Sequence, residues 1–322
     1  MQVIRAARPE EFAWSLVRPV VAIGTMDGVH LGHQAVLASA RELAAALHGT
    51  AAVLTFAQHP LEVVRPAEAP AVITPLPLKL LLLEGCGMEA ALAIEFSAAM
   101  AAVEAEAFVS DILFKRLGVA GLAVGHDFGF GRGRRGTVTL LTSMAASAGV
   151  SLVVVPPVRL GEQVVSSRHV RGLLAAGQVA EARRFLGRPF AVLGQGQPGA
   201  GRGRGLGFPT ANLALLGRPV LKDGVYAGRV LVRGEYRDAV MNLGVAPTFG
   251  AGARRLEIHI AGWAAPLYGE RLVVYILERL RDEARFPDAA ALKSQLERDL
   301  AAAEAVWEAA RGLPWPEWTL QA

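Results

Sequence analysis

Short apolar runs alternate with longer helical stretches through the first half of the chain, which limits the folds available to it. The runs at 19–24 (PVVAIG) and 151–155 (SLVVV) are brief and β-branched, as expected of buried strands. The stretch at 31–47 places apolar residues three and four apart, which predicts a helix. Strands that alternate with helices predict right-handed crossovers and a parallel sheet, so we expect an α/β domain first. The expected strands are 19–24, 50–56, 89–95, 122–125 and 151–155, with helices at 31–47, 77–84, 101–117 and 140–148.

The pattern changes after Gly187. Short strand-like segments with frequent glycine and proline follow, which predict a small antiparallel β-barrel or sandwich. A final helix is expected from Asp288, its N-cap, to about Ala310. We therefore expect two domains, residues 1–187 and 188–322, the second all-β with a C-terminal helix. The strand-like segments are 228–232, 239–243, 256–260 and 272–277.

Composition excludes several classes of protein. Hydrophobic residues make up 52% and charged residues 19% of the 322, too much apolar material for a disordered chain. No apolar stretch reaches the 18 residues or so of a membrane span, and the first residues lack a secretory signal. A single cysteine excludes an internal disulfide framework and a cysteine-cluster metal site. We expect a cytoplasmic globular protein that does not bind membranes.

The formal net charge is only +4, but arginines gather beside glycines at 131–136 (GRGRRG) and 201–205 (GRGRG). Such clusters suit phosphate groups on a small ligand or on nucleic acid, and composition alone does not choose between the two.

The segment 24–33 (GTMDGVHLGH) follows a predicted strand and opens a predicted helix. His30 and His33 are three residues apart and share one face of the first helical turn. The helix N-terminus adds free N–H groups and partial positive charge. The pattern predicts a polyphosphate pocket; the alternative is two surface histidines. The expected phosphate-binding residues here are Gly24, Asp27 and Gly32.

Two further segments offer phosphate or ring contacts. Asp127 and Phe128 follow the predicted strand at 122–125, and aromatics beside arginines could stack a flat ring, although a solvated basic loop is the alternative. Ser166 and Ser167 precede a predicted helix at 168–186, and Arg171 points back towards its N-terminus. This would be a second phosphate clamp, or an ordinary helix cap.

The segment 201–212 (GRGRGLGFPTAN) joins a basic glycine loop to Thr210 and Asn212. These two side chains offer hard oxygen ligands on the same side of an extended chain, and Mg²⁺ prefers such ligands. Backbone N–H groups of the loop would cradle phosphates. The loop residues singled out are Gly203, Arg204 and Gly207.

In LEIHI, residues 256–260, the apolar positions alternate with Glu257 and His259, which therefore share the other face of a strand. The first interpretation is an exposed strand face. The second is a carboxylate that accepts the proton of a hydroxyl attacking a γ-phosphate. Asn242 lies in another polar turn, NLG.

Taken together, these motifs resemble the bifunctional riboflavin kinase/FMN adenylyltransferase (bacterial FAD synthetase) family, over nearly the whole chain and in the family's order. The HxGH element alone resembles the wider nucleotidyltransferase superfamily. The first half carries GxxDGVHxGH, TFxxHP at 55–60 and GxDFxFGxxRxG at 125–136. The second half carries RGRxLGFPTAN at 202–212, NxGxxPTF at 242–249, ExH at 257–259 and RLRDExxF at 279–286.

The resemblance implies phosphorylation of riboflavin to FMN by the second domain and adenylyl transfer from ATP to FMN, giving FAD and pyrophosphate, by the first. It implies a nucleotidyltransferase-type fold followed by a six-stranded barrel, with small molecules rather than nucleic acid as partners. Thr210 and Asn212 would bind Mg²⁺, and Glu257 would be the kinase base. By the same comparison, His30, His33, Ser167 and Arg171 would hold ATP, and Asp127, Phe128, Asn242 and Arg281 would bind flavin.

Three departures from the family pattern stand out. Met26 takes the place of the usual phenylalanine before Asp27, and Gln58 that of the usual proline in TFxPHP. The third is the most serious. The family's SSTRIR is here SSRHVR, with Arg168 in place of threonine and His169 in place of arginine. A kinase that has lost adenylyl transfer therefore remains an alternative, and a nucleic-acid-binding protein using the Gly/Arg loops a remote one. The sequence leaves the oligomeric state open.

Overall fold

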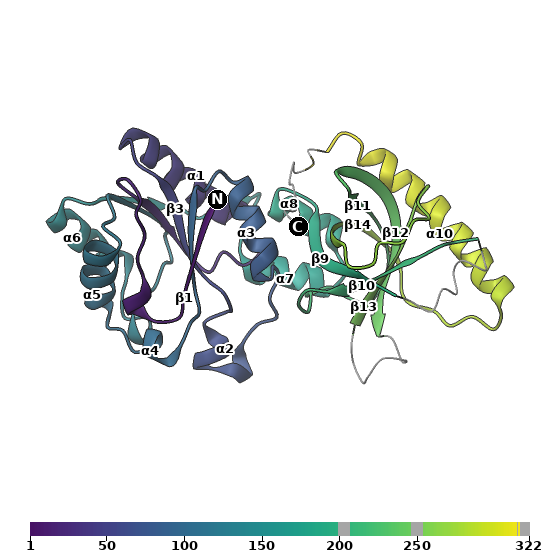
Figure 1. Cartoon of the computed structure of the whole chain (residues 1–322), viewed down its shortest axis with the longest axis horizontal. Helices are drawn as coiled ribbons and strands as arrows, with labels where there is room; N and C mark the ends of the chain where they lie inside the picture. Colours follow the sequence, from purple (N-terminus) through teal and green to yellow (C-terminus); the bar gives the residue numbers. More distant parts are fainter. Residues whose placement is uncertain (199–206, 246–253, 314, 316–322) are drawn as a thin grey trace. The chain divides into compact units, whose positions relative to one another are not determined.

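The computed structural model describes residues 1–198, 207–245, 254–313 and 315. It divides into two compact units, Met1–Ser167 and Arg168–Ala322 (Figure 1).

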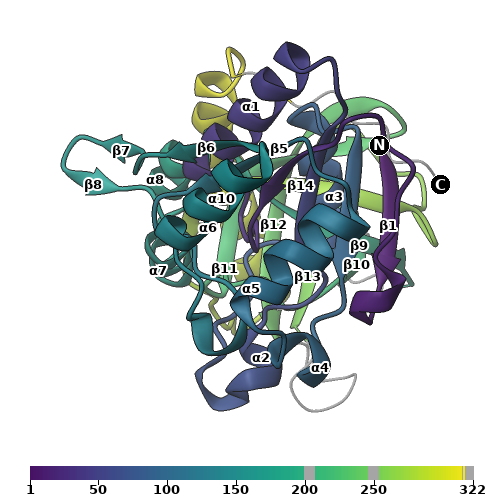
Figure 2. The same ribbon diagram turned by 90° about the vertical axis from the view of Figure 1, so that its left-hand side faces the viewer.

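The first unit is built on a six-stranded parallel sheet in the order β1-β4-β3-β2-β5-β6. Strand β2 (Val20–Ile23) is buried along its whole length, because helices cover both faces of the sheet. Alternate strand residues pack against the helical segment 98–116 and against α6 (Val138–Ala148), which lie in front of the sheet in Figure 2. The α/β prediction is confirmed.

Further strands and helices complete the first unit. The strands are β1 (Gln2–Ala6), β3 (Ala51–Phe56), β4 (Ala90–Ile94), β5 (Gly121–Gly125), β6 (Ser151–Val155) and the small hairpin β7 (Arg159–Leu160) and β8 (Gln163–Val164). The helices are α1 (Leu31–Ala46), α2 (Leu61–Val64), α3 (Leu76–Gly85), α4 (Ala98–Ala101) and α5 (Ala105–Ala107), which continues as a π-helix over Phe108–Arg116.

Strand β2 marks the point where the strand order reverses. From β2 the chain moves outward to β3 and β4 on one side, and later to β5 and β6 on the other. In open parallel sheets, ligands bind at the carboxyl ends of the strands at such a switch point. The loop after β2 carries the GTMDGVHLGH motif, so the fold sets this motif at the favoured place.

The second unit holds a closed barrel of six antiparallel strands in the order β10-β13-β12-β11-β14-β9. Helix α10 (Ala289–Ala309) packs on its outer face through Ala303 and Trp307, and Asp288 caps the helix as expected. The barrel form of the prediction is confirmed. The strands are β9 (Phe190–Gln197), β10 (Ala211–Leu215), β11 (Gly224–Val232), β12 (Glu235–Val245), β13 (Arg254–Ile260) and β14 (Arg271–Arg281).

The expected helix at 168–186 is instead two helices, α7 (Ser167–Ala175) and α8 (Val179–Leu186). Gly177 lies between them with a φ of 79°, a left-handed conformation that ends the first helix. Both helices fall almost wholly in the second unit, whereas the boundary expected from the sequence lies after residue 187. The limit between the functional domains stays a prediction.

None of the helices in the described ranges has both the length and the apolar character needed to cross a bilayer.

Candidate functional site

The paired histidines lie together at the start of α1. His30 is the N-cap residue, and its Nδ1 accepts a hydrogen bond from the His33 N–H at 3.3 Å. The two imidazole rings stack with centroids 3.7 Å apart and planes 15° from parallel. A Cβ on Gly32 would lie 3.1 Å from His30 Cε1, so glycine leaves room for this ring. The motif thus places two imidazoles at a helix N-terminus, where the partial positive charge of the helix favours an anion.

Asp27 is buried beneath this turn. Its carboxylate accepts hydrogen bonds from the backbone N–H groups of Ile73, at 2.9 and 3.2 Å, and of Thr74, at 3.0 Å. Its side chain is therefore engaged with the segment that precedes α3. The Asp27 carboxylate therefore stabilises the loop 24–30 through these hydrogen bonds. Its expected contact with phosphate stays a prediction.

A buried lysine that the sequence reasoning missed completes the support of the loop. The Lys79 ammonium donates to the carbonyl oxygens of Thr25, at 3.0 Å, and Phe56, at 2.7 Å. The Thr55 hydroxyl donates to the same Thr25 oxygen at 3.0 Å. The available signal was a single cation inside the leucine-rich segment 76–83 (LPLKLLLL).

The loop after β5 lies at the same edge of the sheet, because β2 and β5 are adjacent and parallel. Asp127 is exposed there, and the Arg134 guanidinium donates to its carbonyl oxygen at 3.4 Å. The Phe128 ring stacks on Phe130 with centroids 5.3 Å apart. Arg132 pairs with Glu104 at 3.2 Å. The aromatic and basic side chains expected to receive a flat ring are therefore gathered in one loop.

The serine motif reaches the histidine loop. The Ser167 hydroxyl donates to the backbone carbonyl of Asp27 at 2.8 Å, and Ser166 next to it is half-buried. Arg168 is exposed, whereas the His169 ring packs edge-on against Phe185 of α8, with centroids 4.5 Å apart. Arg171 lies on α7 in the second unit, so its expected place beside the histidines stays a prediction.

In the barrel, the register aligns three polar side chains on neighbouring strands. Glu257 of β13 is directly opposite Asn212 of β10 on one side and Asn242 of β12 on the other. Directly opposed residues in antiparallel strands point to the same face, with Cβ atoms about 5 Å apart. Asn212 is 8% exposed, whereas Glu257 is open to solvent. The expected meeting of Asn212 and Glu257 thus follows from strand pairing.

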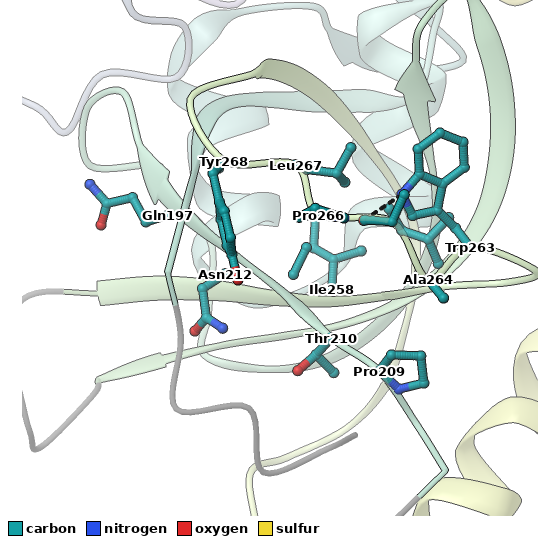
Figure 3. Close-up of a pocket in the computed structure, with 14 residues that line it drawn as sticks. Gln197, Pro209, Thr210, Asn212, Ile258, Trp263, Ala264, Pro266, Leu267 and Tyr268 are labelled. Carbon is teal, nitrogen blue, oxygen red and sulfur yellow. Dashed lines mark hydrogen bonds between the residues drawn. The ribbon is translucent and has the colours of Figure 1, made fainter. Parts of the chain in front are cut away.

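Thr210 lies two residues before Asn212 and is exposed. Both side chains project from the same side of the chain in Figure 3, and both line a pocket beside Trp263 and Tyr268. Among the described residues, Glu257 does not line this pocket but lies beside it, opposite Asn212.

His259, which shares the face of Glu257, holds this segment in place. Its Nδ1 lies 2.9 Å from the carbonyl oxygen of Pro209, and its ring meets Phe208 edge-on at 5.7 Å between centroids. A carbonyl oxygen only accepts hydrogen bonds, so this geometry requires a proton on Nδ1. The sequence placed His259 on the correct face, and the structure adds its partner.

Two residues expected to bind flavin already have protein partners. The Asn242 amide donates to Glu283 at 3.1 Å, whereas its buried Oδ1 has no hydrogen-bond partner among the described residues. Arg281 forms a two-pronged pair with Asp299 of α10, at 2.8 and 2.7 Å. The structure thus makes Arg281 a tether for the C-terminal helix, and its flavin contact stays a prediction.

The expected phosphate loop is only partly described. Gly203 and Arg204 lie outside the described residues, whereas Gly207 is exposed with a φ of 85°. Within the described ranges, no group of three or more histidine, cysteine or acidic side chains forms a metal centre. The hydroxyl of Thr210 and the amide oxygen of Asn212 nevertheless suit a hard cation that takes its remaining ligands from phosphates and water.

Comparisons with known proteins match both units. Residues 14–169 match the family model described as FAD synthetase, and residues 186–307 match the model described as riboflavin kinase. Two relatives are each called a bifunctional riboflavin kinase/FMN adenylyltransferase. The protein of Escherichia coli strain K12 is 38% identical over 281 residues, which cover 87% of this chain and 90% of the relative. The protein of Pseudomonas fluorescens is 39% identical over 288 residues, which cover 89% and 92%.

A solved structure has the same fold. The crystal structure described as a macrolide-efflux protein from Streptococcus pneumoniae is 28% identical, with a TM-score of 0.84. The match covers 94% of this chain and 99% of that one.

Proposed function

Because the chain belongs to the bifunctional riboflavin kinase/FMN adenylyltransferase family, we propose that it makes FMN and then FAD from riboflavin and two molecules of ATP. The observation that carries the proposal is that each matched domain brings together a set of polar side chains suited to binding phosphate. The first is the stacked pair His30 and His33 at a helix N-terminus. The second is the row of Asn212, Glu257 and Asn242 on the barrel.

In the first unit, the phosphate of FMN attacks the α-phosphorus of ATP, and pyrophosphate leaves. This chemistry needs no covalent enzyme intermediate; it needs alignment and stabilisation of the charge that develops on the phosphoryl oxygens. The His30 and His33 rings and the N–H groups of α1 supply donors for those oxygens. Asp127 and Phe128, at the same edge of the sheet, would receive the flavin, and Ser167 and Arg171 would hold the nucleotide.

In the second unit, the 5′-hydroxyl of riboflavin attacks the γ-phosphorus of ATP, and ADP leaves. Glu257 accepts the proton of that hydroxyl, a role open to it because its carboxylate faces solvent next to the nucleotide pocket. The pocket lined by Thr210 and Asn212 would receive the ATP phosphates. Asn242, directly opposite Glu257, would orient the flavin.

Thr210 and Asn212 would also hold Mg²⁺. Their two hard oxygens fit a cation that shares the phosphate groups, and such an ion neutralises charge on the transferred phosphoryl group. His259 contributes by fixing the carbonyl of Pro209, which keeps the segment with both ligands against β13.

Two alternatives from the sequence are less well supported. The FAD synthetase model matches the first domain over 14–169, and the relatives are named for both activities, which favours two reactions over a kinase alone. The Gly/Arg segment at 131–136 lies next to the proposed flavin loop, which favours small-molecule phosphates over nucleic acid. The expected cytoplasmic location remains part of this proposal, since both reactions consume ATP.

The test is a time course with the purified full chain, riboflavin, ATP and Mg²⁺, with the flavins separated by chromatography. We expect FMN to rise first and FAD to follow. Accumulation of FMN without any FAD would support the kinase reaction and contradict adenylyl transfer. A failure to convert riboflavin at all would contradict the kinase reaction.

A further inference from the structure

Buried polar and charged side chains concentrate around the loop 24–30. Seven such residues occur in the described part of the chain, and five of them lie in this loop or touch it. Most buried polar groups in folded proteins form hydrogen bonds, and a cluster of them therefore calls for a structural or functional explanation. The five residues are Asp27, His30, Thr55, Thr74 and Lys79.

Lys79 is the unusual member of this set. Its side chain is 4% exposed, and its ammonium donates to two backbone carbonyl oxygens. The Thr25 oxygen follows the end of β2, and the Phe56 oxygen belongs to the last residue of β3. The ammonium therefore ties together the carboxyl ends of two adjacent parallel strands, immediately before the histidine loop.

That loop needs support because its backbone is strained. Met26 has a φ of 51° and Val29 a φ of 40°, although neither is glycine and valine is β-branched. Each such conformation costs on the order of 1–3 kcal/mol and persists only where the surroundings impose it. Lys79 holds the loop at Thr25, and the amides before α3 hold it at Asp27.

Packing alone does not require a cation at position 79. Its neighbours Leu78, Leu82 and Leu83 on α3 are buried, and a leucine or methionine would bury there at lower cost than an ammonium. Burial lowers the pKa of Lys79 to about 8, against the opposing fields of the Asp27 and Glu62 carboxylates, which raise it. The side chain thus stays charged at neutral pH and loses its charge in the alkaline range.

We propose that Lys79 is a positioning residue of the adenylyl-transfer site, whose ammonium fixes the loop that carries His30 and His33 through the carbonyl oxygens of Thr25 and Phe56. Lys79 does not touch substrate; it acts through the histidines. The inference rests on the adenylyl transfer proposed above for the first unit.

Loss of the proton weakens this support. Charge-assisted hydrogen bonds are roughly twice as strong as neutral ones, so the neutral amine holds the two carbonyls less firmly. The maximal rate of FAD formation should therefore decline as the pH rises through the range in which Lys79 loses its proton. The riboflavin kinase reaction of the same chain should not share this decline.

The experiment compares Lys79→Met and Lys79→Arg with a matched control, Lys115→Met. Lys115 is an exposed lysine that pairs with Asp111 at 2.7 Å, and within the described part of the chain no hydrogen bond or ion pair links it to the loop. For each full-length protein, kcat and KM are measured for FMN plus ATP to FAD and for riboflavin to FMN, from about pH 7 to about pH 9.5, a range that spans the lysine titration.

We expect Lys79→Met to lower kcat of FAD formation by about tenfold or more, with a much smaller change in the KM for ATP, because misplaced groups slow the reaction more than they weaken binding. Kinase kcat should stay unchanged in all variants. The alkaline decline should appear in the wild type and in Lys115→Met. It should be absent from Lys79→Met, which has no proton to lose, and from Lys79→Arg, which keeps its charge throughout.

Equal FAD formation by Lys79→Met and Lys115→Met, or the same alkaline decline in all four proteins, would overturn the role of Lys79. If Lys79→Met does not fold, the pH dependence of kcat for FAD formation in the wild type and in Lys79→Arg still tests the role of Lys79. A wild type that converts riboflavin to FMN but never makes FAD would instead overturn the proposed adenylyl transfer, and the role of Lys79 with it.

Discussion

The hydroxyl of Ser167 donates to the backbone carbonyl of Asp27 at 2.8 Å, although 140 residues separate the two in the sequence. Asp27 belongs to the histidine loop, and Ser167 begins α7. The contact joins two motifs that the sequence could identify only one at a time. It engages the backbone of Asp27, whereas Ile73 and Thr74 engage the carboxylate of the same residue.

Ser167→Ala tests this contact. The change removes the hydroxyl that donates to the Asp27 carbonyl, and loss of one such hydrogen bond costs about 0.5–1.5 kcal/mol. We expect slower FAD formation from FMN and unchanged FMN formation from riboflavin, measured on the same preparation. Ser147→Ala is the control, because that hydroxyl only donates within α6. Equal FAD formation by both variants would mean that the contact has no part in the reaction.

Glu257→Gln removes the proposed kinase base while keeping the shape of the side chain. General-base catalysis contributes about 10²- to 10⁴-fold, so kcat for FMN formation should fall by that order. Conversion of added FMN to FAD should persist, since it occurs in the other unit. Glu278→Gln, a change of another exposed glutamate on the barrel, should leave both rates as they were. A kinase rate that survives Glu257→Gln would assign the base elsewhere.

Arg281→Met separates a tether from a flavin-binding residue. Its partner Asp299 is 3% exposed and would lose its counter-charge while keeping the hydrogen bond from the Gln295 amide at 2.8 Å. Because the Arg281 side chain is itself partly exposed, the cost should fall below about 3–5 kcal/mol, the cost for a fully buried pair. We expect a clear drop in the thermal unfolding temperature of the barrel unit, partly restored by the double change Arg281→Met with Asp299→Leu. Lys293→Met, which changes an exposed cation on α10, should have little effect. An unchanged melting temperature with a raised KM for riboflavin would instead favour direct flavin binding.

The metal proposal predicts a selective dependence on Mg²⁺. Chelation should abolish FMN formation, and added Mg²⁺ should restore it. Asn212→Ala removes one of the two expected ligands, so the Mg²⁺ concentration for half-maximal kinase activity should rise by about tenfold, equivalent to about 1.4 kcal/mol. Gln195→Ala on the adjacent strand β9 serves as the comparison. The same Mg²⁺ requirement in both variants would exclude Asn212 as a ligand.

The sequence predicted the elements whose pattern is local. Five of the six parallel strands and the helices at 31–47 and 140–148 were recoverable because these strands read as short apolar runs and helices as apolar spacings of three and four. The expectation that 151–155 is a buried strand was wrong, because β6 is an edge strand and of its five residues only Val155 is buried. Strand β1 was missed because it lies at the sheet edge, where most of its side chains are exposed and the apolar signal is weak. The break at Gly177 was missed because a lone glycine within a helical pattern is often tolerated.

The candidate sites show the same division. The pairing of His30 with His33 and the shared face of Glu257 and His259 follow from helix and strand periodicity, so the sequence was sufficient. The burial of Lys79 and the bond between Arg281 and Asp299 depend on which distant segments pack together. No local sequence pattern encodes those contacts. A comparison of motifs can suggest that a residue binds a ligand, but it does not show which protein group that residue contacts in the fold.

If one chain carries two independent sites, two variants that are each disabled at a different site should complement each other when they are mixed. Glu257→Gln alone should make neither FMN nor FAD from riboflavin, and His33→Ala alone should stop at FMN. The mixture should restore FAD, because FMN made by one protein can be used by the other. A mixture that still stops at FMN, with Glu257→Gln unable to use added FMN, would contradict two independent sites.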